Sequence, residues 1–220
     1  MNSFTEENYL KTIFKLLEKG VSEVSTNAIA ERVNTKASSV TDMLKKLSDK
    51  KLINYQKYQG VSLTRQGKKI ALNIIRKHRL WEVLLVEKLN FKWDEVHDIA
   101  EQLEHVNSEE LVSRLDKFLN YPRFDPHGDP IPDIKGNFQH QESQPLSRFK
   151  KNNICVMMGV IDHSSSFLQY LDKMDILLGH EIQIKEITSY DKSFYISINK
   201  KKNIYISNQI AQNILVSLSR

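Results

Sequence analysis

The 220-residue sequence predicts a mainly α protein with small β elements: an N-terminal winged helix-turn-helix, a helical middle domain and a C-terminal β-barrel. Apolar residues recur at helical spacing through most of the first 120 residues. Two short apolar runs around a glycine turn follow the third helical pattern, and short alternating runs return after residue 150. All five prolines lie between residues 122 and 145, where the pattern changes. We therefore expect domains over 1–70, 71–140 and 151–220, with a linker over 141–150.

The first seventy residues are expected to form the winged helix-turn-helix. Thr5 is a plausible N-cap of the first helix, and Gly20 is its expected stop. A short turn separates the next two helices, and a hairpin follows them, which is the order of a winged-helix DNA-binding domain. The expected elements are helices over 5–19, 27–33 and 37–50 and strands over 52–57 and 61–63.

The rest of the chain is expected to be first helical and then β. Thr64 caps a long helical pattern, and the runs beyond residue 150 are short enough for the strands of a small barrel. The expected elements are helices over 64–89, 94–106 and 108–120 and strands over 154–161, 181–188, 194–198 and 203–207.

Composition restricts the class of protein. No apolar run approaches the roughly 20 residues that span a membrane, and the first seven residues are not a signal peptide. A single cysteine, Cys155, excludes a disulfide within the chain and a four-thiolate metal site. A single cysteine is typical of a protein in a reducing compartment. We expect a cytoplasmic protein with no membrane partner.

Charge is distributed unevenly along the chain. Residues 1–70 carry 13 Lys/Arg against 7 Asp/Glu, whereas residues 71–140 carry 9 against 13 and five of the seven histidines. A basic module beside an acidic, histidine-rich module indicates one part that attracts polyanions and one that attracts cations. Solvated faces of different charge are the alternative.

Four potential metal ligands share one face of the helix expected over 94–106, within an arc of about 100°. A mixed nitrogen and oxygen site of this kind suits Mn²⁺, Fe²⁺, Co²⁺ or Zn²⁺. His78 and Glu82 form a further i,i+4 pair on the preceding helix. Ordinary solvated side chains on an amphipathic helix are the alternative. The four residues are His97, Glu101, Glu104 and His105.

Motifs of catalysis are missing from the sequence. Residues 101–105 match neither H-E-x-x-H nor H-x-x-E-H, and no second Glu-x-x-His completes a di-iron bundle. There is no glycine-rich phosphate loop and no G-x-S-x-G. We expect no enzyme.

Several segments together are similar to one known family. The sequences Arg76-Lys77-His78-Arg79-Leu80-Trp81-Glu82, Val96-His97-Asp98 and Glu104-His105-Val106 carry the similarity, with support from residues 9–13, 29–32, 63–67 and 128–132. They resemble the diphtheria toxin repressor family of metal-dependent (iron/manganese) transcriptional repressors, in its long form with a C-terminal SH3-like domain. The resemblance covers nearly the whole chain and is weakest in the last seventy residues.

The resemblance implies two metal sites with Mn²⁺ or Fe²⁺ as co-repressor. Glu101 stands where iron-responsive members have cysteine, which shifts the preference toward Mn²⁺. Asn8 replaces an aspartate of manganese-responsive members, and Lys11 replaces a bridging glutamate of their two-domain form. The implied primary ligands are Asn8, Glu101, Glu104 and His105, the ancillary ligands are His78, Glu82 and His97, and further candidates are Asp125, His127 and His163.

The resemblance also implies a homodimer that binds double-stranded, palindromic operator DNA and represses genes of metal-ion homeostasis. The helix over 37–50 would enter the major groove with its N-terminal end. Ser38 and Ser39 are alternatively plain helix caps. The alternatives to this function are a winged-helix regulator with a non-metal effector, or a metallohydrolase. The expected DNA contacts are Lys36, Ser38, Ser39, Thr41, Asp42, Lys57 and Tyr58.

Overall fold

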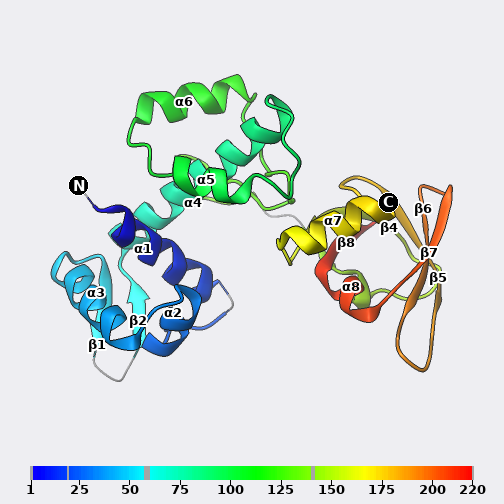
Figure 1. Cartoon of the computed structure of the whole chain (residues 1–220), viewed down its shortest axis with the longest axis horizontal. Coiled ribbons are helices and arrows are strands. Elements are labelled where there is room, and N and C mark those ends of the chain that lie inside the picture. Colours follow the sequence, from blue (N-terminus) through cyan, green and yellow to red (C-terminus); the bar gives the residue numbers. More distant parts are fainter. Residues whose placement is uncertain (1, 19, 57–59, 140–141, 220) are drawn as a thin grey trace. The chain divides into compact units, whose positions relative to one another are not determined.

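The computed structural model describes residues 2–18, 20–56, 60–139 and 142–219 (Figure 1). The chain divides into two compact units, which are described separately. Unit 1 comprises Met1–His78, Gln102–Val112 and Pro132–Phe138, and unit 2 comprises Arg79–Glu101, Ser113–Ile131 and Gln139–Arg220.

Unit 1 begins with helix α1 (Phe4–Leu17), whose N-cap is Ser3. The Ser3 hydroxyl accepts from the Glu6 backbone N–H, and the Glu6 carboxylate accepts from the Ser3 backbone N–H, which is a capping box. The prediction of Thr5 as N-cap was therefore wrong by two residues. Tyr9, Leu10, Ile13 and Phe14 of α1 are buried in the core, whereas Phe4 is exposed.

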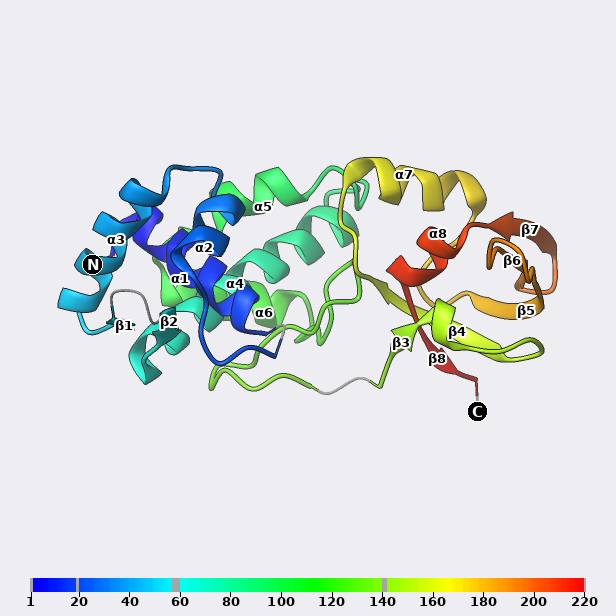
Figure 2. The ribbon, with the colours of Figure 1, turned by 90° about the horizontal axis from the view of Figure 1, so that it is seen from below.

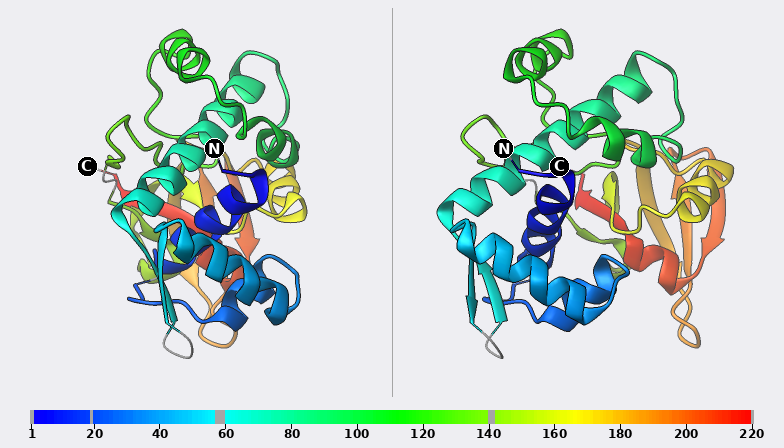
Figure 3. Two further views of the ribbon diagram at one scale, coloured as in Figure 1. Left: turned by 90° about the vertical axis from the view of Figure 1, so that its left-hand side faces the viewer. Right: turned by 60° about the vertical axis from the view of Figure 1, so that its left-hand side comes forward.

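Helices α2 (Thr26–Arg32) and α3 (Ala37–Asp49) follow, and strands β1 (Ile53–Gln56) and β2 (Gly60–Leu63) form an antiparallel hairpin. Figure 3 shows the hairpin beside these helices. The three helices and the hairpin share one core with the start of the next helix. The predicted winged helix-turn-helix is therefore confirmed. The expected capping by Ser38 or Ser39 is not observed, because the N-cap of α3 is Lys36.

Helix α4 (Arg65–Glu87) begins after Thr64, whose hydroxyl accepts from the Gly67 backbone N–H as predicted. Helix α5 (His97–Leu103) is shorter than the predicted helix over 94–106. At its start, Asp94 contacts Ser165 and Gln169 instead of beginning a helix. At its end, a turn closes from the Val106 N–H to the Leu103 carbonyl. Helix α6 (Glu109–Phe118) follows.

In unit 2, six antiparallel strands form a sheet in the order β3-β8-β4-β5-β6-β7. Helices α7 and α8 contribute Phe167, Leu171 and Ala211 to the same apolar core as the strands (Figure 2). The predicted C-terminal β domain is confirmed, but both helices and strands β3 and β8 were not predicted. Among the described residues, no helix is long and apolar enough to cross a membrane. The elements are β3 (Gln144–Pro145), η1 (Leu146–Arg148), β4 (Ile154–Val160), α7 (Ser165–Met174), β5 (Glu181–Ile187), β6 (Phe194–Ile198), β7 (Lys202–Ile206), α8 (Asn208–Asn213) and β8 (Ile214–Leu218).

Candidate metal centre and DNA-binding elements

A buried polar cluster in unit 1 joins α1 to the turn that follows α5. His105 Nδ1 lies 2.7 Å from Glu7 Oε2, and His78 Nδ1 lies 2.7 Å from Glu104 Oε2. An ionised carboxylate only accepts, so each imidazole carries its proton on Nδ1. His105 Nε2, the other ring nitrogen, lies 3.7 Å from Glu104 Oε1.

Glu104 and His105 lie beyond the end of α5, so the prediction of one helix over 94–106 was wrong for both. Because α5 ends at Leu103, Glu104 and His105 are positioned by the following turn and not by one helical face. The turn directs both side chains into the cluster, where Glu104 is fully buried and His105 is 8% exposed. The His105 ring also stacks on Phe4, with 4.6 Å between ring centroids.

Asn8, the residue after Glu7 on α1, bears on whether this part of unit 1 suits a metal ion. Its Oδ1 atom is buried and has no hydrogen-bond partner among the described residues. A buried polar atom without a partner is costly and rare in a native structure. Amide oxygen, carboxylate and imidazole together form a donor set suited to Mn²⁺ or Fe²⁺. The residues therefore fit a divalent transition-metal ion.

Two members of the cluster, Glu7 and Lys11, were not predicted as site residues. They lie one turn apart on α1, and they are 7% and 6% exposed. Lys11 Nζ lies 2.6 Å from Glu104 Oε1. A charged i,i+4 pair on the apolar face of a helix was the available signal in the sequence.

Burial and neighbouring charges set the protonation of this cluster. Burial alone would raise the pKa of Glu104, but hydrogen bonds and charge from His78 and Lys11 lower it. Burial lowers the pKa of Lys77, against the opposing effect of Glu7 and Glu104. Glu104 is therefore held as a carboxylate, the form that a metal ion requires.

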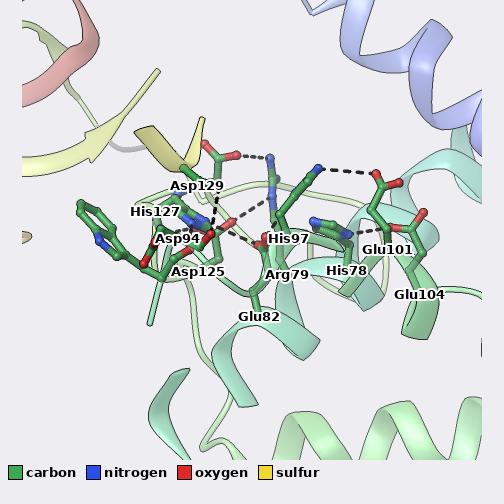
Figure 4. Close-up of polar contacts among 12 residues, drawn as sticks. His78, Arg79, Glu82, Asp94, His97, Glu101, Glu104, Asp125, His127 and Asp129 are labelled. Atoms are coloured by element: carbon green, nitrogen blue, oxygen red, sulfur yellow. Dashed lines mark hydrogen bonds and ion pairs between the residues drawn. The ribbon is translucent and has the colours of Figure 1, made fainter. Parts of the chain in front are cut away.

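A second cluster lies within unit 2 and consists of Glu82, Asp125 and His127 (Figure 4). Each residue offers a ligand atom within 4.8 Å of the others, and all three are buried. His127 Nε2 lies 2.8 Å from the Trp93 carbonyl oxygen. A carbonyl only accepts, so Nε2 carries the proton. His127 Nδ1 lies 3.7 Å from Glu82 Oε2, and it becomes a ligand atom when its proton is released.

The pKa values in the second cluster reflect two carboxylates, Glu82 and Asp125, that are buried close together. Burial raises the pKa of Asp125 to about 7, reinforced by Asp129 and Glu82. Burial would lower the pKa of His127, but Glu82 and Asp125 outweigh it and raise that pKa to about 9. A cation among these groups would relieve the repulsion of the carboxylates.

The loop over 125–129 is held in place by several groups of unit 2. Asp125 Oδ1 accepts from the backbone N–H groups of His127 and Asp129. Arg79 contacts Asp129 at 2.9 Å and Asp125 at 3.5 Å. Gly128 has a φ of +88°, and the Val160 N–H donates to the His127 carbonyl, which holds the loop against β4. The ligand atoms are thus oriented by surrounding groups.

The remaining predicted ligands lie near this second cluster. His97 Nδ1 is 3.7 Å from Glu82 Oε1, and His97 Nε2 is 3.7 Å from Glu101 Oε1. The His163 ring lies 5.0 Å from the His127 ring. Glu101 is 42% exposed in its side chain and His97 46%. Unit 2 thus contains six of the predicted ligands: Glu82, His97, Glu101, Asp125, His127 and His163.

The predicted DNA contacts lie at the start of α3. Lys36, Ser38, Ser39 and Asp42 are exposed, and Thr41 is half-buried. The Thr41 hydroxyl donates to the Ala37 carbonyl, and Asp42 forms an exposed ion pair with Lys45 at 3.4 Å. Lys57 and Tyr58 lie outside the described residues.

Glu6 connects the first turn of α1 to the end of α3. Its buried carboxylate lies 3.1 Å from Lys46 Nζ and 2.8 Å from Lys50 Nζ. Burial would raise the pKa of Glu6, but the hydrogen bonds from Lys50, the Ser3 backbone and Lys46 lower it to about 2. Glu6 is the neighbour of Glu7, so the metal-site turn of α1 is also tied to the helix expected to read DNA.

A winged helix-turn-helix whose first helix enters a buried cluster of nitrogen and oxygen ligands defines a metal-responsive DNA-binding protein. Comparison with known proteins gives the family. Residues 2–61 match the model "Iron dependent repressor, N-terminal DNA binding domain". Residues 64–133 match "Iron dependent repressor, metal binding and dimerisation domain", and residues 144–218 match "FeoA domain".

Individual relatives agree with these models. The iron-dependent repressor IdeR of Mycobacterium tuberculosis is 38% identical over 130 residues, which cover 59% of this chain and 56% of IdeR. The diphtheria toxin repressor of Corynebacterium diphtheriae is 29% identical over 96% of both chains. Only about half the length of the mycobacterial relative is therefore matched.

Solved structures extend the similarity to the full chain. A manganese-dependent transcriptional repressor in complex with manganese is 31% identical, with a TM-score of 0.86 over 97% of this chain and 100% of that chain. ScaR with bound Cd²⁺ is 30% identical, with a TM-score of 0.77 over 96% of this chain and 98% of its own. The chain belongs to the diphtheria toxin repressor family of metal-dependent transcriptional repressors. The comparisons give no support to a metallohydrolase or to a regulator with a non-metal effector.

Proposed function

We propose that this protein is a metal-dependent transcriptional repressor of metal-ion homeostasis, with Mn²⁺ or Fe²⁺ as co-repressor and double-stranded palindromic DNA as its partner. The observation that carries the proposal is the buried cluster of unit 1. Glu104 and His105, from the part of the chain that matches the metal-binding model, contact Glu7 and Lys11 of α1. Helix α1 belongs to the winged helix-turn-helix.

The proposed primary ligands are Asn8, Glu101, Glu104 and His105. The proposed ancillary ligands are His78, Glu82 and His97, and the further candidates are Asp125, His127 and His163. The unpartnered Asn8 Oδ1 supports the first set, and the grouping of Glu82, Asp125 and His127 supports the second. A divalent cation held by these groups would neutralise carboxylates and give the first turn of α1 a fixed position.

Contacts of Glu6 and Glu7 connect the first turn of α1 to the helix expected to bind DNA. Glu7 is fixed by His105, and its neighbour Glu6 is fixed by Lys46 and Lys50 of the α3 end. The position of the turn therefore influences the position of α3, whose exposed N-terminal residues face solvent. Ligand and DNA affinities must then change together, since linkage is reciprocal.

The proposed organisation is a cytoplasmic homodimer. We assign DNA binding to residues 1–70, dimerisation and metal binding to 71–140, a linker to 141–150 and an SH3-like domain to 151–220. Leu111 and Phe118 lie two turns apart on α6 and are exposed, which supports an apolar dimer contact on the helical domain. A two-fold dimer matches a palindromic operator because both share the same symmetry.

The test uses double-stranded DNA selected by the full chain from a random palindromic library in the presence of Mn²⁺. We expect EDTA to weaken binding at least tenfold, and binding with Mn²⁺ to fall steeply with added salt. Glu104→Gln should remove the Mn²⁺ dependence, whereas Asp172→Asn on α7 should not. Equal DNA affinity with Mn²⁺ and with EDTA would refute the proposal.

A further inference from the structure

The Lys11 ammonium contacts Glu104, which is a proposed metal ligand. Lys11 Nζ lies 2.6 Å from Glu104 Oε1, and the two side chains are 7% and 0% exposed. A buried ammonium is costly unless it is paired, and so is a buried carboxylate. Each group therefore depends on the other.

The Glu104 oxygen that contacts Lys11 also lies near the Nε2 atom of His105. Glu104 Oε1 lies 3.7 Å from His105 Nε2, and its other oxygen accepts from His78. A divalent ion held by Glu104 Oε1 and His105 Nε2 would need bonds of roughly 2.0–2.2 Å to both. Lys11 Nζ stands at hydrogen-bond distance from that oxygen, so ammonium and metal ion compete for one position.

The charges of the cluster also indicate competition between Lys11 and a metal ion. Two buried ammonium groups, Lys11 and Lys77, lie with the two buried carboxylates, Glu7 and Glu104. A divalent cation would add two positive charges beside these ammonium groups. Lys77 donates to the Val106 carbonyl at 3.4 Å, whereas Lys11 donates directly to the proposed ligand, which makes Lys11 the group to be displaced.

We propose that Lys11 is an internal cation that competes with the metal ion for Glu104 and so sets the metal concentration at which the protein responds. In the metal-free state the ammonium holds the carboxylate. In the metal-bound state the flexible lysine side chain leaves Glu104 and its ammonium reaches solvent. This inference rests on the proposed function, because it takes Glu104 as a metal ligand.

The first test measures Mn²⁺ affinity of the full chain by titration calorimetry. Lys11→Met removes the charge at similar length and should tighten Mn²⁺ binding at least tenfold. Lys11→Arg keeps the charge and should not tighten it, and Lys15→Met, one turn further along α1, should leave it unchanged. Lys11→Gln serves the same purpose if Lys11→Met does not fold.

Separate outcomes distinguish this inference from the proposed function. Equal Mn²⁺ affinity for wild type and Lys11→Met would overturn the competition while leaving the metal site in place. Equal Mn²⁺ affinity for wild type and Glu104→Gln would overturn the metal site itself. Tighter Mn²⁺ binding by Lys11→Met, but not by Lys11→Arg or Lys15→Met, would support both the competition and the metal site.

A second measurement needs no variant. Lysine acetylation of the wild-type protein, followed by mass spectrometry, reports the exposure of each ammonium group. Labelling of Lys11 should be slow without Mn²⁺ and several-fold faster with it, while labelling of Lys77 should not change. Equal Lys11 labelling in both conditions, at saturating Mn²⁺, would overturn the displacement.

Discussion

Replacing Gly128 by alanine tests whether the second ligand cluster depends on the close approach of its loop to β4. A Cβ at this position would lie 2.1 Å from the Met158 carbonyl oxygen and 2.5 Å from the Gly159 Cα. Real Cβ atoms essentially never approach within 3.0 Å, so the separation must grow from 2.1 to 3.0 Å, by about 0.9 Å. Both neighbouring atoms belong to the backbone, and so the loop or the strand itself must shift.

The magnitude follows from two contributions. Alanine at a φ of +88° costs about 1 kcal/mol in backbone strain. Overpacking against backbone costs about 1–3 kcal/mol more. Gly179 is the matched control, since its φ is +80° and a Cβ there meets nothing within 4 Å. At about 2–4 °C per kcal/mol for a chain of this size, Gly128→Ala should lower Tm by about 4–16 °C and Gly179→Ala by about 2–4 °C.

Calorimetric unfolding and Mn²⁺ titration of the three proteins provide the assay. Gly128→Ala should also weaken Mn²⁺ binding, because a shift of the loop displaces Asp125 and His127 from Glu82. Gly179→Ala should bind Mn²⁺ as wild type does. Equal decreases in Tm for the two variants would refute the reasoning, since they would show that the loop yields without cost.

Three other predictions concern single residues. Asn8→Asp adds a carboxylate to the primary donor set and should tighten Mn²⁺ binding by about tenfold; unchanged affinity would show that residue 8 is not a ligand. Glu6→Gln should lower the free energy of unfolding in urea by about 1–2 kcal/mol at pH 7. Because the fold lowers the pKa of Glu6 from 4.5 to about 2, its stabilisation is present above pH 4.5 and is lost as the pH falls toward 2; a deficit that persists at pH 2 would contradict this. Burial raises the pKa of Cys155 to about 11, so a thiol reagent at pH 8 should label it only after unfolding, and rapid labelling of the native protein would be inconsistent with the structure.

Local patterns were sufficient to predict most of the N-terminal half. The helical spacing of apolar residues located α1, α3 and α4, and the glycine turn located the hairpin. The errors were also local: Ser3 competes with Thr5 as a cap, and the reciprocal bonds with Glu6 decide in favour of Ser3. In the C-terminal part, the serine-rich start of α7 hid an amphipathic helix whose packing on the sheet supplies most of its stability.

The long-range contacts of the site could not be predicted from periodicity. The pairs Lys11–Glu104 and Glu7–His105 are separated by 93 and 98 residues, and nothing local specifies either. The pattern predicted Glu104 and His105 on one helical face with His97 and Glu101, but α5 ends at Leu103, before Glu104 and His105. The grouping of Asp125 and His127 with Glu82 required the loop to be placed against β4, which depends on tertiary packing.

The contact between Trp93 and His127 has a practical consequence. The two rings are nearly parallel, with centroids 6.1 Å apart, and the Trp93 carbonyl holds the imidazole. The chain has only one other tryptophan, Trp81. Paramagnetic ions such as Mn²⁺ quench a nearby indole, so the emission of Trp93 would serve as an intrinsic optical reporter for occupancy of the second cluster, independent of any signal from DNA.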